Sequence, residues 1–321
     1  MAFDALVSKK AGALALIAAA GVSLTPIPAD ARPAAPTGRQ AAAPARHLPG
    51  GLSALAWMVA DADTGKVLAA KNSHRRLAPA STLKTLFAVT VLPKFSSGRV
   101  RQVSADDLAG LGAGSSVVGV RQGQRYTVAD LWRGVFLRSG NDAVHVLAAM
   151  NGGWSATAQE MQRTARRLGA RDTTVKSPDG YDAPGQVSSA FDLTVFARAG
   201  LANDDFARYC STTRAGFPAA GGGTVQIENT NRMLVGSHGL TRYPGIIGVK
   251  NGYTSKAGNT LVAAAHRNGR TLIVTVLNPQ SGEANGVYKE AGALLDWGFN
   301  NATRPEPAGR SGSDDADDDD S

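Results

Sequence analysis

The fold is decided by the stretch Pro79-Ala-Ser81-Thr-Leu-Lys84-Thr-Leu-Phe87. This stretch places two polar side chains at the start of an apolar helix. Proline is tolerated in the first turn of a helix, and Pro93 ends the segment. The apolar residues between the prolines recur with helical spacing, at Leu83, Leu86, Phe87 and Val91. Side chains three residues apart share one helix face, so we expect Ser81 and Lys84 to lie side by side.

This serine–lysine spacing can carry nucleophilic chemistry. An unassisted serine hydroxyl is a poor nucleophile and needs a neighbour that accepts its proton. Lysine can accept it only when burial or a nearby cation lowers its pKa from about 10.4 toward neutrality. The apolar helix favours burial of Lys84, and the free N–H groups of a helix start suit a developing oxyanion. Alone, the spacing also arises by chance and fits a capping serine with a surface lysine.

Two more polar motifs follow along the chain. Ser139-Gly-Asn141 joins one helical pattern to the next, and Lys250-Asn-Gly252 stands at the end of an apolar strand pattern. The first motif alone fits a helix end and restart. The second alone fits an edge-strand lysine followed by an Asn-Gly turn. Their order behind the serine–lysine pair makes them candidates for one site.

Hydrophobic periodicity predicts strands near both ends of the chain and helices between them. The predicted strands are 54–60, 66–70, 246–250, 260–266 and 271–277, with a tight turn at Asn268-Gly269. One predicted helix begins at residue 79 and ends before Pro93. The others cover 128–136, 142–150, 156–168 and 283–297. We therefore expect an α/β fold with sheet and helices segregated (α+β-like), in which one antiparallel sheet formed from both chain ends carries a helical insertion.

Composition divides the chain into four segments. Residues 1–31 have a positive start, a 14-residue apolar run and a small-residue cleavage site, which predicts a secretory signal peptide or, alternatively, an uncleaved anchor. Residues 32–50 are a Pro/Ala-rich linker, and residues 51–301 form one globular domain. Residues 302–321 have six aspartates among the last eight residues and are expected to be disordered. The globular part is therefore expected to be exported.

The formal net charge of +8 could favour anionic partners such as nucleic acid or an anionic cell wall. Basic runs interleaved with aromatic residues are absent, so we expect no binding to nucleic acid. The single cysteine, Cys210, excludes a disulfide within the chain and is expected to be a small buried side chain. Paired-cysteine and His-Glu-x-x-His zinc motifs are also absent.

Taken in order, Ser-x-x-Lys, Ser-x-Asn and Lys-x-Gly are the motifs of penicillin-binding proteins and related β-lactamases. The chain resembles the serine-type D-Ala-D-Ala carboxypeptidases, which are the low-molecular-weight penicillin-binding proteins. The likeness covers nearly all of residues 52–300, and implies their fold and a peptidase domain over 51–301. It includes Leu77-Ala-Pro-Ala-Ser81, Tyr126-Thr-Val-Ala-Asp-Leu131, Gly180-Tyr-Asp-Ala-Pro-Gly185, Asn229-Thr-Asn231-Arg and Leu294-Leu-Asp-Trp-Gly298.

The resemblance implies roles for the catalytic residues. Ser81 would attack the carbonyl between two D-alanines and form an acyl-enzyme, with Lys84 as general base. Ser139 would relay the proton to the leaving amine. The oxyanion hole would be the N–H groups of Ser81 and Tyr253.

The resemblance also implies how the substrate is held. Asn141 would hydrogen-bond the substrate amide, and Lys250 would attract the terminal carboxylate. The remaining binding residues would be Asn251, Tyr253 and Thr254. The implied partners are peptidoglycan stem peptides ending in D-Ala-D-Ala, with β-lactams as covalent inhibitors. Neither a metal nor an organic cofactor is implied, and the enzyme would be extracellular or associated with the cell wall.

Two departures from the family pattern concern the carboxylate. Asn251 stands where the family usually has threonine, so an amide replaces a hydroxyl, and Thr254 could partly substitute. Some relatives also hold the carboxylate with an arginine in the turn after the last strand, but the segment 279–283 has none. We therefore expect slower turnover or altered substrate preference, with acylation retained.

Three other functions are compatible with parts of the pattern. A β-lactamase shares the motifs, but neither Glu160 nor Glu228 is placed like the loop glutamate that speeds deacylation in many of those enzymes. A weakly catalytic module that binds cell-wall peptides would have only the Asn251 change in its favour. A Ser-His-Asp hydrolase lacks its Gly-x-Ser-x-Gly motif here.

Overall fold

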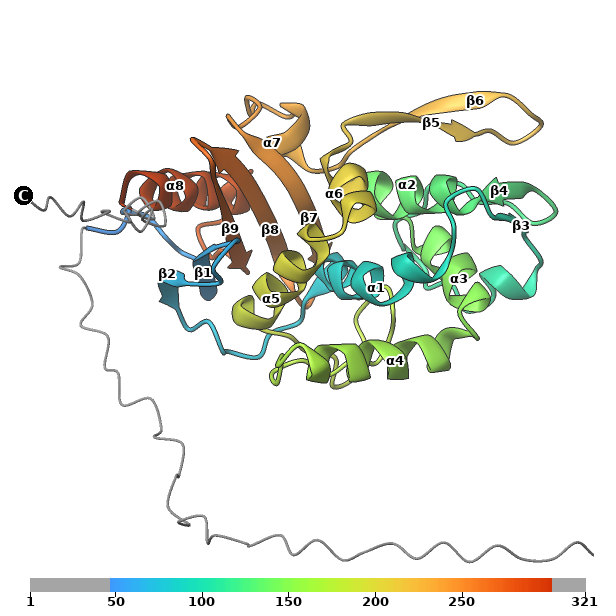
Figure 1. Ribbon diagram of the computed structural model, residues 1–321, viewed down its shortest axis with the longest axis horizontal. Helices are drawn as coiled ribbons and strands as arrows, with labels where there is room; N and C mark the ends of the chain where they lie inside the picture. The colour runs from blue at the N-terminus through green and yellow to red at the C-terminus, as the bar shows by residue number, and fades with distance from the viewer. Residues whose placement is uncertain (1–46, 302–321) are drawn as a thin grey trace, which may run out of the picture. The chain divides into compact units, whose positions relative to one another are not determined.

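The computed structural model describes residues 47–301 (Figure 1). The predicted signal peptide (1–31), nearly all of the linker (32–50) and the acidic tail (302–321) lie outside these residues. Within residues 47–301, no helix is both long enough and apolar enough to cross a bilayer.

Five strands form one antiparallel sheet in the order β2-β1-β9-β8-β7 (Figure 1). Strand β1 pairs with its sequence neighbour β2 and with β9 from the far end of the chain. The predicted sheet from both chain ends is therefore confirmed, and β7 lies at its edge. The bounds are Ala56–Asp61 (β1), Val67–Lys71 (β2), Ile246–Thr254 (β7), Gly258–Arg267 (β8) and Arg270–Leu277 (β9).

The middle strands are apolar on both faces because helices cover both sides of the sheet. Along β8, Leu261 and Ala263 belong to the core that includes helix α8 (Gly286–Asn301). Val262 and Ala264, between and after them, belong to the core shared with the other helices. Successive side chains of a strand point to opposite faces, so burial on both sides requires the continuous apolar run in the sequence.

The helical insertion is also confirmed, and Figure 1 shows α1 and α5 on the face of the sheet opposite α8. A 3₁₀ turn (Ala80–Leu83) leads directly into α1, and Leu92–Lys94 forms another after it. The α-helices are Lys84–Val91 (α1), Val128–Arg138 (α2), Asn141–Met150 (α3), Trp154–Arg167 (α4), Ala190–Leu201 (α5), Asp204–Ser211 (α6) and Arg232–Val235 (α7).

Two small antiparallel ribbons were not predicted from periodicity. They pair Val100–Gln102 (β3) with Arg125–Thr127 (β4), and Arg214–Pro218 (β5) with Thr224–Glu228 (β6). Strands of three to five residues are too short to establish an alternation. Helix α5 was also missed, because burial on most of its surface removes the amphipathic pattern.

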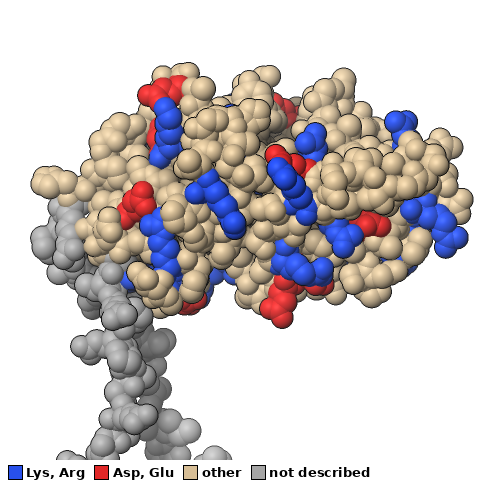
Figure 2. Space-filling model, turned by 90° about the horizontal axis from the view of Figure 1, so that it is seen from above, with Lys and Arg blue, Asp and Glu red and all other residues tan. Residues whose placement is uncertain are grey.

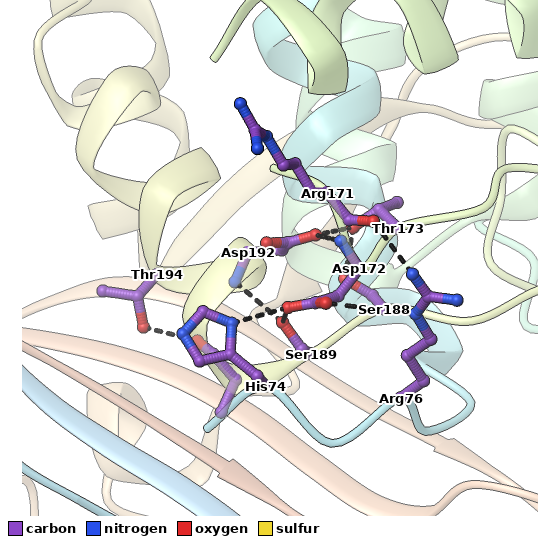
Figure 3. A network of polar contacts seen from close by, with 10 residues as sticks. His74, Arg76, Arg171, Asp172, Thr173, Ser188, Ser189, Asp192 and Thr194 are labelled. Atoms are coloured by element: carbon purple, nitrogen blue, oxygen red, sulfur yellow. Dashed lines mark hydrogen bonds and ion pairs between the residues drawn. The ribbon is translucent and has the colours of Figure 1, made fainter. Parts of the chain in front are cut away.

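A polar network holds the chain that enters the nucleophile segment against the start of α5 (Figure 3). Leu77 and Ser188 exchange two backbone hydrogen bonds of 2.9 Å each. Deeper in the network, Asp192 accepts hydrogen bonds from the backbone N–H of Asp172 and the hydroxyl of Thr173. We call this group the α5 cap network; it consists of His74, Asp172, Thr173, Ser188, Ser189 and Asp192.

Candidate active site

Ser81 lies in the 3₁₀ turn that precedes α1, and Lys84 is the first residue of α1. The Lys84 ammonium nitrogen donates to Ser81 Oγ at 2.8 Å and to the Asp179 carbonyl oxygen at 2.8 Å. Lys84 is 1% exposed, as its apolar sequence surroundings predicted. The contact joins a serine hydroxyl to a buried amine, which is the arrangement that activates a serine.

Burial lowers the pKa of Lys84 from 10.5 to about 8. Desolvation disfavours the charged ammonium, while the negative charges of Asp179 and Asp142 partly oppose the shift. A fraction of this lysine is therefore a neutral amine near neutral pH, and a neutral amine can accept the proton of Ser81.

Lys250 lies in the middle of β7 and is also buried, with 1% exposure. Burial lowers the pKa of Lys250 well below its usual range, and the charge of Lys84 lowers it further. Its amine donates to the carbonyl oxygen of Asn251 at 2.8 Å. Two like charges in one buried region disfavour each other, so protonation of either lysine makes protonation of its neighbour harder.

Ser139 and Asn141 lie at the junction of α2 and α3. Ser139 ends α2 in the left-handed conformation at φ 57°, Gly140 precedes the next helix, and Asn141 begins α3. This is the predicted helix end and restart, with Ser139 itself in the left-handed position. Among residues 47–301, Ser139 Oγ and Asn141 Oδ1 are buried without a hydrogen-bond partner. Buried polar atoms of this kind call for a partner, and a bound substrate can supply one.

Gly252 allows the edge strand β7 to pack directly against Ser81. A Cβ added at Gly252 would lie 2.7 Å from the backbone nitrogen of Ser81 and 2.7 Å from the hydroxyl of Thr260. A larger residue would therefore separate the strand from the nucleophile. Tyr253 follows at the rim, where its side chain is 66% exposed.

A cleft of about 630 Å³ opens beside these groups. Of the predicted site residues, its walls include Ser81, Ser139, Asn251 and Tyr253. Lys84, Asn141 and Lys250 are buried and do not form its walls.

Thr254 lies outside the cleft walls, because its hydroxyl turns to the loop after α4. It donates to a carboxylate oxygen of Asp182 at 2.8 Å. The hydroxyl that we expected to compensate for Asn251 is therefore engaged elsewhere.

Asn251 pairs with a residue that motif reasoning did not select. Its side-chain oxygen accepts from the Thr230 hydroxyl at 3.1 Å, and its side-chain nitrogen donates to the Thr230 carbonyl at 3.3 Å. Thr230 lies inside the segment Asn229-Thr-Asn231-Arg, so the resemblance marked the region without indicating the contact. Asp179, whose carbonyl binds Lys84, was also missed.

Asp142 supports the wall of the cleft opposite β7. Its carboxylate accepts hydrogen bonds from the backbone N–H groups of Val118, Gly119 and Val120. The backbone N–H of Asn141 donates to the carbonyl of Ser116 at 2.8 Å. The start of α3 therefore holds the loop before β4 in place.

Other sequence interpretations concern residues away from the cleft. Cys210 is fully buried, and burial raises the pKa of its thiol to about 12, so it is a small core side chain as expected. Figure 2 shows basic and acidic side chains interspersed over the face seen from above. That face has no continuous basic surface of the kind that binds nucleic acid.

The fold and this serine–lysine pair define a serine hydrolase with the fold of penicillin-binding proteins. The sequence pattern of the family described as D-alanyl-D-alanine carboxypeptidase (Peptidase_S11) matches residues 40–281. The chain therefore belongs to the D-alanyl-D-alanine carboxypeptidase family.

Individual relatives agree. The chain is 39% identical over 246 residues to the D-alanyl-D-alanine carboxypeptidase DacB2 of Mycobacterium tuberculosis, covering 76% of this chain and 81% of that protein. It is 33% identical to DacD of Escherichia coli, covering 77% of this chain but 63% of that longer protein.

Solved structures show the same fold. The crystal structure of a D-alanyl-D-alanine carboxypeptidase from Mycobacterium tuberculosis matches with a TM-score of 0.72 and 37% identity, covering 81% of this chain and 95% of that one. The Streptomyces K15 DD-transpeptidase also matches with a TM-score of 0.72, at 27% identity, covering 79% of this chain and 100% of the other.

Proposed function

We propose that this chain is a serine-type D-Ala-D-Ala carboxypeptidase that removes the terminal D-alanine of peptidoglycan stem peptides through an acyl-enzyme. The observation that carries the proposal is the 2.8 Å contact between Ser81 Oγ and the buried amine of Lys84. The pKa of about 8 for that amine suits a base that works near neutral pH. Family membership supplies the substrate class.

In the first step, neutral Lys84 takes the proton of Ser81 while Ser81 Oγ attacks the carbonyl carbon between the two D-alanines. The oxyanion that forms accepts hydrogen bonds from the backbone N–H groups of Ser81 and Tyr253. The C–N bond then breaks as the proton held by Lys84 passes through Ser139 to the leaving amine, so Lys84 and Ser139 both return to their starting states. Water hydrolyses the remaining ester, which releases the shortened peptide and regenerates Ser81.

The unpartnered atoms of the site fit substrate binding. Asn141 holds the substrate amide, and its partnerless Oδ1 is available to accept from an N–H group. Lys250 binds the terminal carboxylate, whose negative charge favours the protonated form that burial alone disfavours. Asn251 acts together with Thr230, because each already binds the other. Thr254 contributes indirectly, by tying the end of β7 to Asp182.

The proposed reaction sets the partners and the location. Peptidoglycan is outside the cytoplasm, so the enzyme acts there, free or associated with the wall. β-Lactams are covalent inhibitors, because their strained amide would acylate Ser81 as the peptide does.

Fast β-lactam turnover is not expected, because both glutamates considered for deacylation are bound to other side chains. Glu160 binds Lys94 and Asn151, and Glu228 binds Arg214. Purified enzyme should therefore hold a β-lactam label for minutes and turn over a chromogenic cephalosporin slowly.

The proposal is tested with a labelled penicillin and a pentapeptide ending in D-Ala-D-Ala. Wild-type protein should become covalently labelled and release D-alanine, whereas Ser81→Ala should do neither. Ser237→Ala is a matched control, because Ser237 also lines the cleft and has no role in the proposed chemistry. Absence of label and of D-alanine release from folded wild-type protein would refute the proposal, and so would equal labelling of Ser81→Ala.

A further inference from the structure

A buried glutamine closes the segment between α4 and α5 that contains Asp179. Gln186, at the end of residues 176–186 (the 176–186 loop), is 3% exposed. Its Oε1 accepts from the backbone N–H groups of Lys176 and Ser177 at 2.9 and 2.7 Å. Its Nε2 donates to the Ser177 hydroxyl at 3.0 Å and to the Tyr181 carbonyl at 2.6 Å. The amide thereby uses both donor hydrogens and both acceptor positions, so Gln186 fixes the start and the middle of the loop.

The carboxylate of Asp179 holds the turn of this loop. One of its oxygens accepts from the Ser177 hydroxyl at 2.7 Å and from the backbone N–H of Tyr181 at 3.0 Å. Gly180, in the turn, has a φ of 82°, and a Cβ added there would collide with the carbonyl oxygen of Ala80. Glycine alone combines this φ with such a close backbone contact. The loop is therefore packed directly against the 3₁₀ turn that carries the nucleophile.

The loop reaches the general base through a backbone carbonyl. The Asp179 carbonyl oxygen accepts from the Lys84 amine at 2.8 Å, and the same amine lies 2.8 Å from Ser81 Oγ. A neutral amine has two N–H groups and one lone pair. While one N–H donates to the Asp179 carbonyl, rotation of the amine is restricted and its lone pair can face the Ser81 hydroxyl. The carbonyl therefore orients the base for proton transfer.

A second attachment of the loop does not involve Gln186. The carboxylate of Asp182 accepts from the Thr254 hydroxyl at 2.8 Å and from the backbone N–H of Lys256 at 3.3 Å. These bonds hold the loop to the end of β7. A change at Gln186 therefore shifts the Asp179 part of the loop without releasing the whole loop.

We propose that Gln186 is a positioning residue for acylation, because it sets the loop conformation in which the Asp179 carbonyl aims the Lys84 amine at Ser81. This inference rests on the proposed function. Gln186 does not line the cleft, so it acts through the loop and touches neither the substrate nor the reacting atoms. Without its amide, the backbone groups of residues 176, 177 and 181 lose buried partners, and the loop moves to satisfy them with water. The Asp179 carbonyl moves with the loop, and the base is misplaced.

The orientation of Lys84 can be measured separately from its protonation. Burial lowers the pKa of Lys84 to about 8, and the charges of Asp179 and Asp142 partly oppose the shift. Lys250 is a neighbouring amine whose pKa is lowered by burial and by the charge of Lys84. A rate measured near neutral pH therefore depends on these charges as well as on geometry. Above about pH 9.5 Lys84 is almost entirely neutral, so the plateau of the acylation rate reports how well the base is placed.

The test is stopped-flow acylation of the full chain by a penicillin, from pH 7 to the plateau. In that reaction Ser81 Oγ bonds to the lactam carbonyl carbon, the ring C–N bond opens, and the ring nitrogen takes the proton. Gln186→Met nearly keeps the volume of the side chain and removes its amide. We expect the plateau rate to fall about thirtyfold, since a misplacement of about 1 Å costs up to roughly a hundredfold. The dissociation constant of the first, non-covalent complex should change less than about twofold, because Gln186 does not contact the ligand.

Gln162, on α4, provides a matched control. Its Nε2 donates to the Thr173 carbonyl at 3.0 Å, and its Oε1 accepts from the backbone N–H of Val175 at 2.9 Å. Gln162 therefore binds the chain just before the loop in the way that Gln186 binds the loop itself. Gln162→Met should also lower the melting temperature, but it should leave the plateau rate and the dissociation constant as in the wild type.

Ser177→Ala is a milder variant that keeps the inference testable if Gln186→Met does not fold. The Ser177 hydroxyl accepts from Gln186 and donates to Asp179, so its loss weakens the link between the two side chains. We expect a plateau rate about fivefold below that of the wild type, the factor that corresponds to one hydrogen bond of about 1 kcal/mol.

The outcomes separate this inference from the proposed function. Wild-type plateau rates in folded Gln186→Met, or in Ser177→Ala where Gln186→Met does not fold, would overturn the role of Gln186 and leave the carboxypeptidase standing. An equal loss of plateau rate in Gln162→Met would also overturn it, because general destabilisation would then explain the effect. Wild-type protein that is not acylated and releases no D-alanine would overturn both proposals.

Discussion

Two buried polar clusters, the α5 cap network and the catalytic cluster, differ in how completely their hydrogen bonds are formed. In the α5 cap network, one oxygen of Asp192 accepts from the Asp172 N–H at 2.8 Å and from the Thr173 hydroxyl at 2.7 Å. At the catalytic cluster, Ser139 Oγ and Asn141 Oδ1 have no partner among the described residues.

The difference indicates that the α5 cap network supports the fold, whereas the catalytic cluster serves the reaction. A buried polar atom without a partner costs about 1–3 kcal/mol, so the catalytic cluster reduces stability and the network offsets part of that cost. Even in the network one atom, Asp192 Oδ1, lacks a partner, and burial raises the pKa of that carboxyl. Changes at the catalytic cluster should therefore alter rate, and changes in the network should alter stability.

The largest effect should come from Lys84→Ala. Loss of the general base should lower the rate of penicillin acylation and kcat/KM for the pentapeptide about a thousandfold. The melting temperature should stay within a few degrees, because the substitution removes a buried charge that is costly to hold. Lys94→Ala, which changes an exposed lysine paired with Glu160, is the control and should leave the rate unchanged. A Lys84→Ala variant with a wild-type acylation rate would contradict the distinction between a catalytic cluster that sets the rate and a network that sets stability.

The next effect is on pH dependence. Only the neutral form of Lys84 can accept the Ser81 proton, and burial sets its pKa at about 8. Acylation should therefore rise about tenfold per pH unit below 8 and level off above it. Stopped-flow labelling between pH 5.5 and 9.5 measures this profile. A rate that is flat from pH 6 to 8 would contradict the assignment of Lys84 as the base.

In the network, Thr173→Val should lower the free energy of unfolding by about 2 kcal/mol, because it removes a hydrogen bond to the buried Asp192 carboxylate. For a domain of this size that corresponds to a fall of roughly 5 °C in melting temperature. The pentapeptide rate at 25 °C should change less than about twofold. Thr224→Val, at an exposed threonine of β6, is the matched control. A large loss of rate with unchanged stability would show that the network is part of the catalytic machinery.

The smallest effect should be that of Asn251→Thr. Threonine at this position gives up the two contacts with Thr230 and frees a hydroxyl for the substrate carboxylate. One hydrogen bond of this kind is worth about 0.5–1.5 kcal/mol, so kcat/KM for the pentapeptide should rise about threefold. An unchanged or lower value would mean that the Asn251–Thr230 pair already serves the carboxylate as well as threonine does.

Sequence reasoning predicted the parts of the molecule that depend on local pattern. The strands at both ends, helices α1 to α4 and the contact between Ser81 and Lys84 follow from periodicity and spacing. The missed contacts join residues far apart in the chain. Asn251 binds Thr230 across 21 positions, Thr254 binds Asp182 across 72, and Lys84 binds Asp179 across 95. Local periodicity does not encode such pairs. The hydrogen bond of the Thr254 hydroxyl could therefore be identified only from the three-dimensional structure.

The position of β7 at the edge of the sheet has a consequence for inhibitor design. Within residues 47–301, no strand pairs with its outer side. An extended peptide can therefore dock there as an additional strand, held by main-chain hydrogen bonds that do not depend on side-chain identity. Methylation of the peptide nitrogens that face β7 would remove those bonds while leaving the scissile carbonyl intact. Such N-methylated mimics would measure how much affinity comes from backbone pairing and how much from the carboxylate at the end.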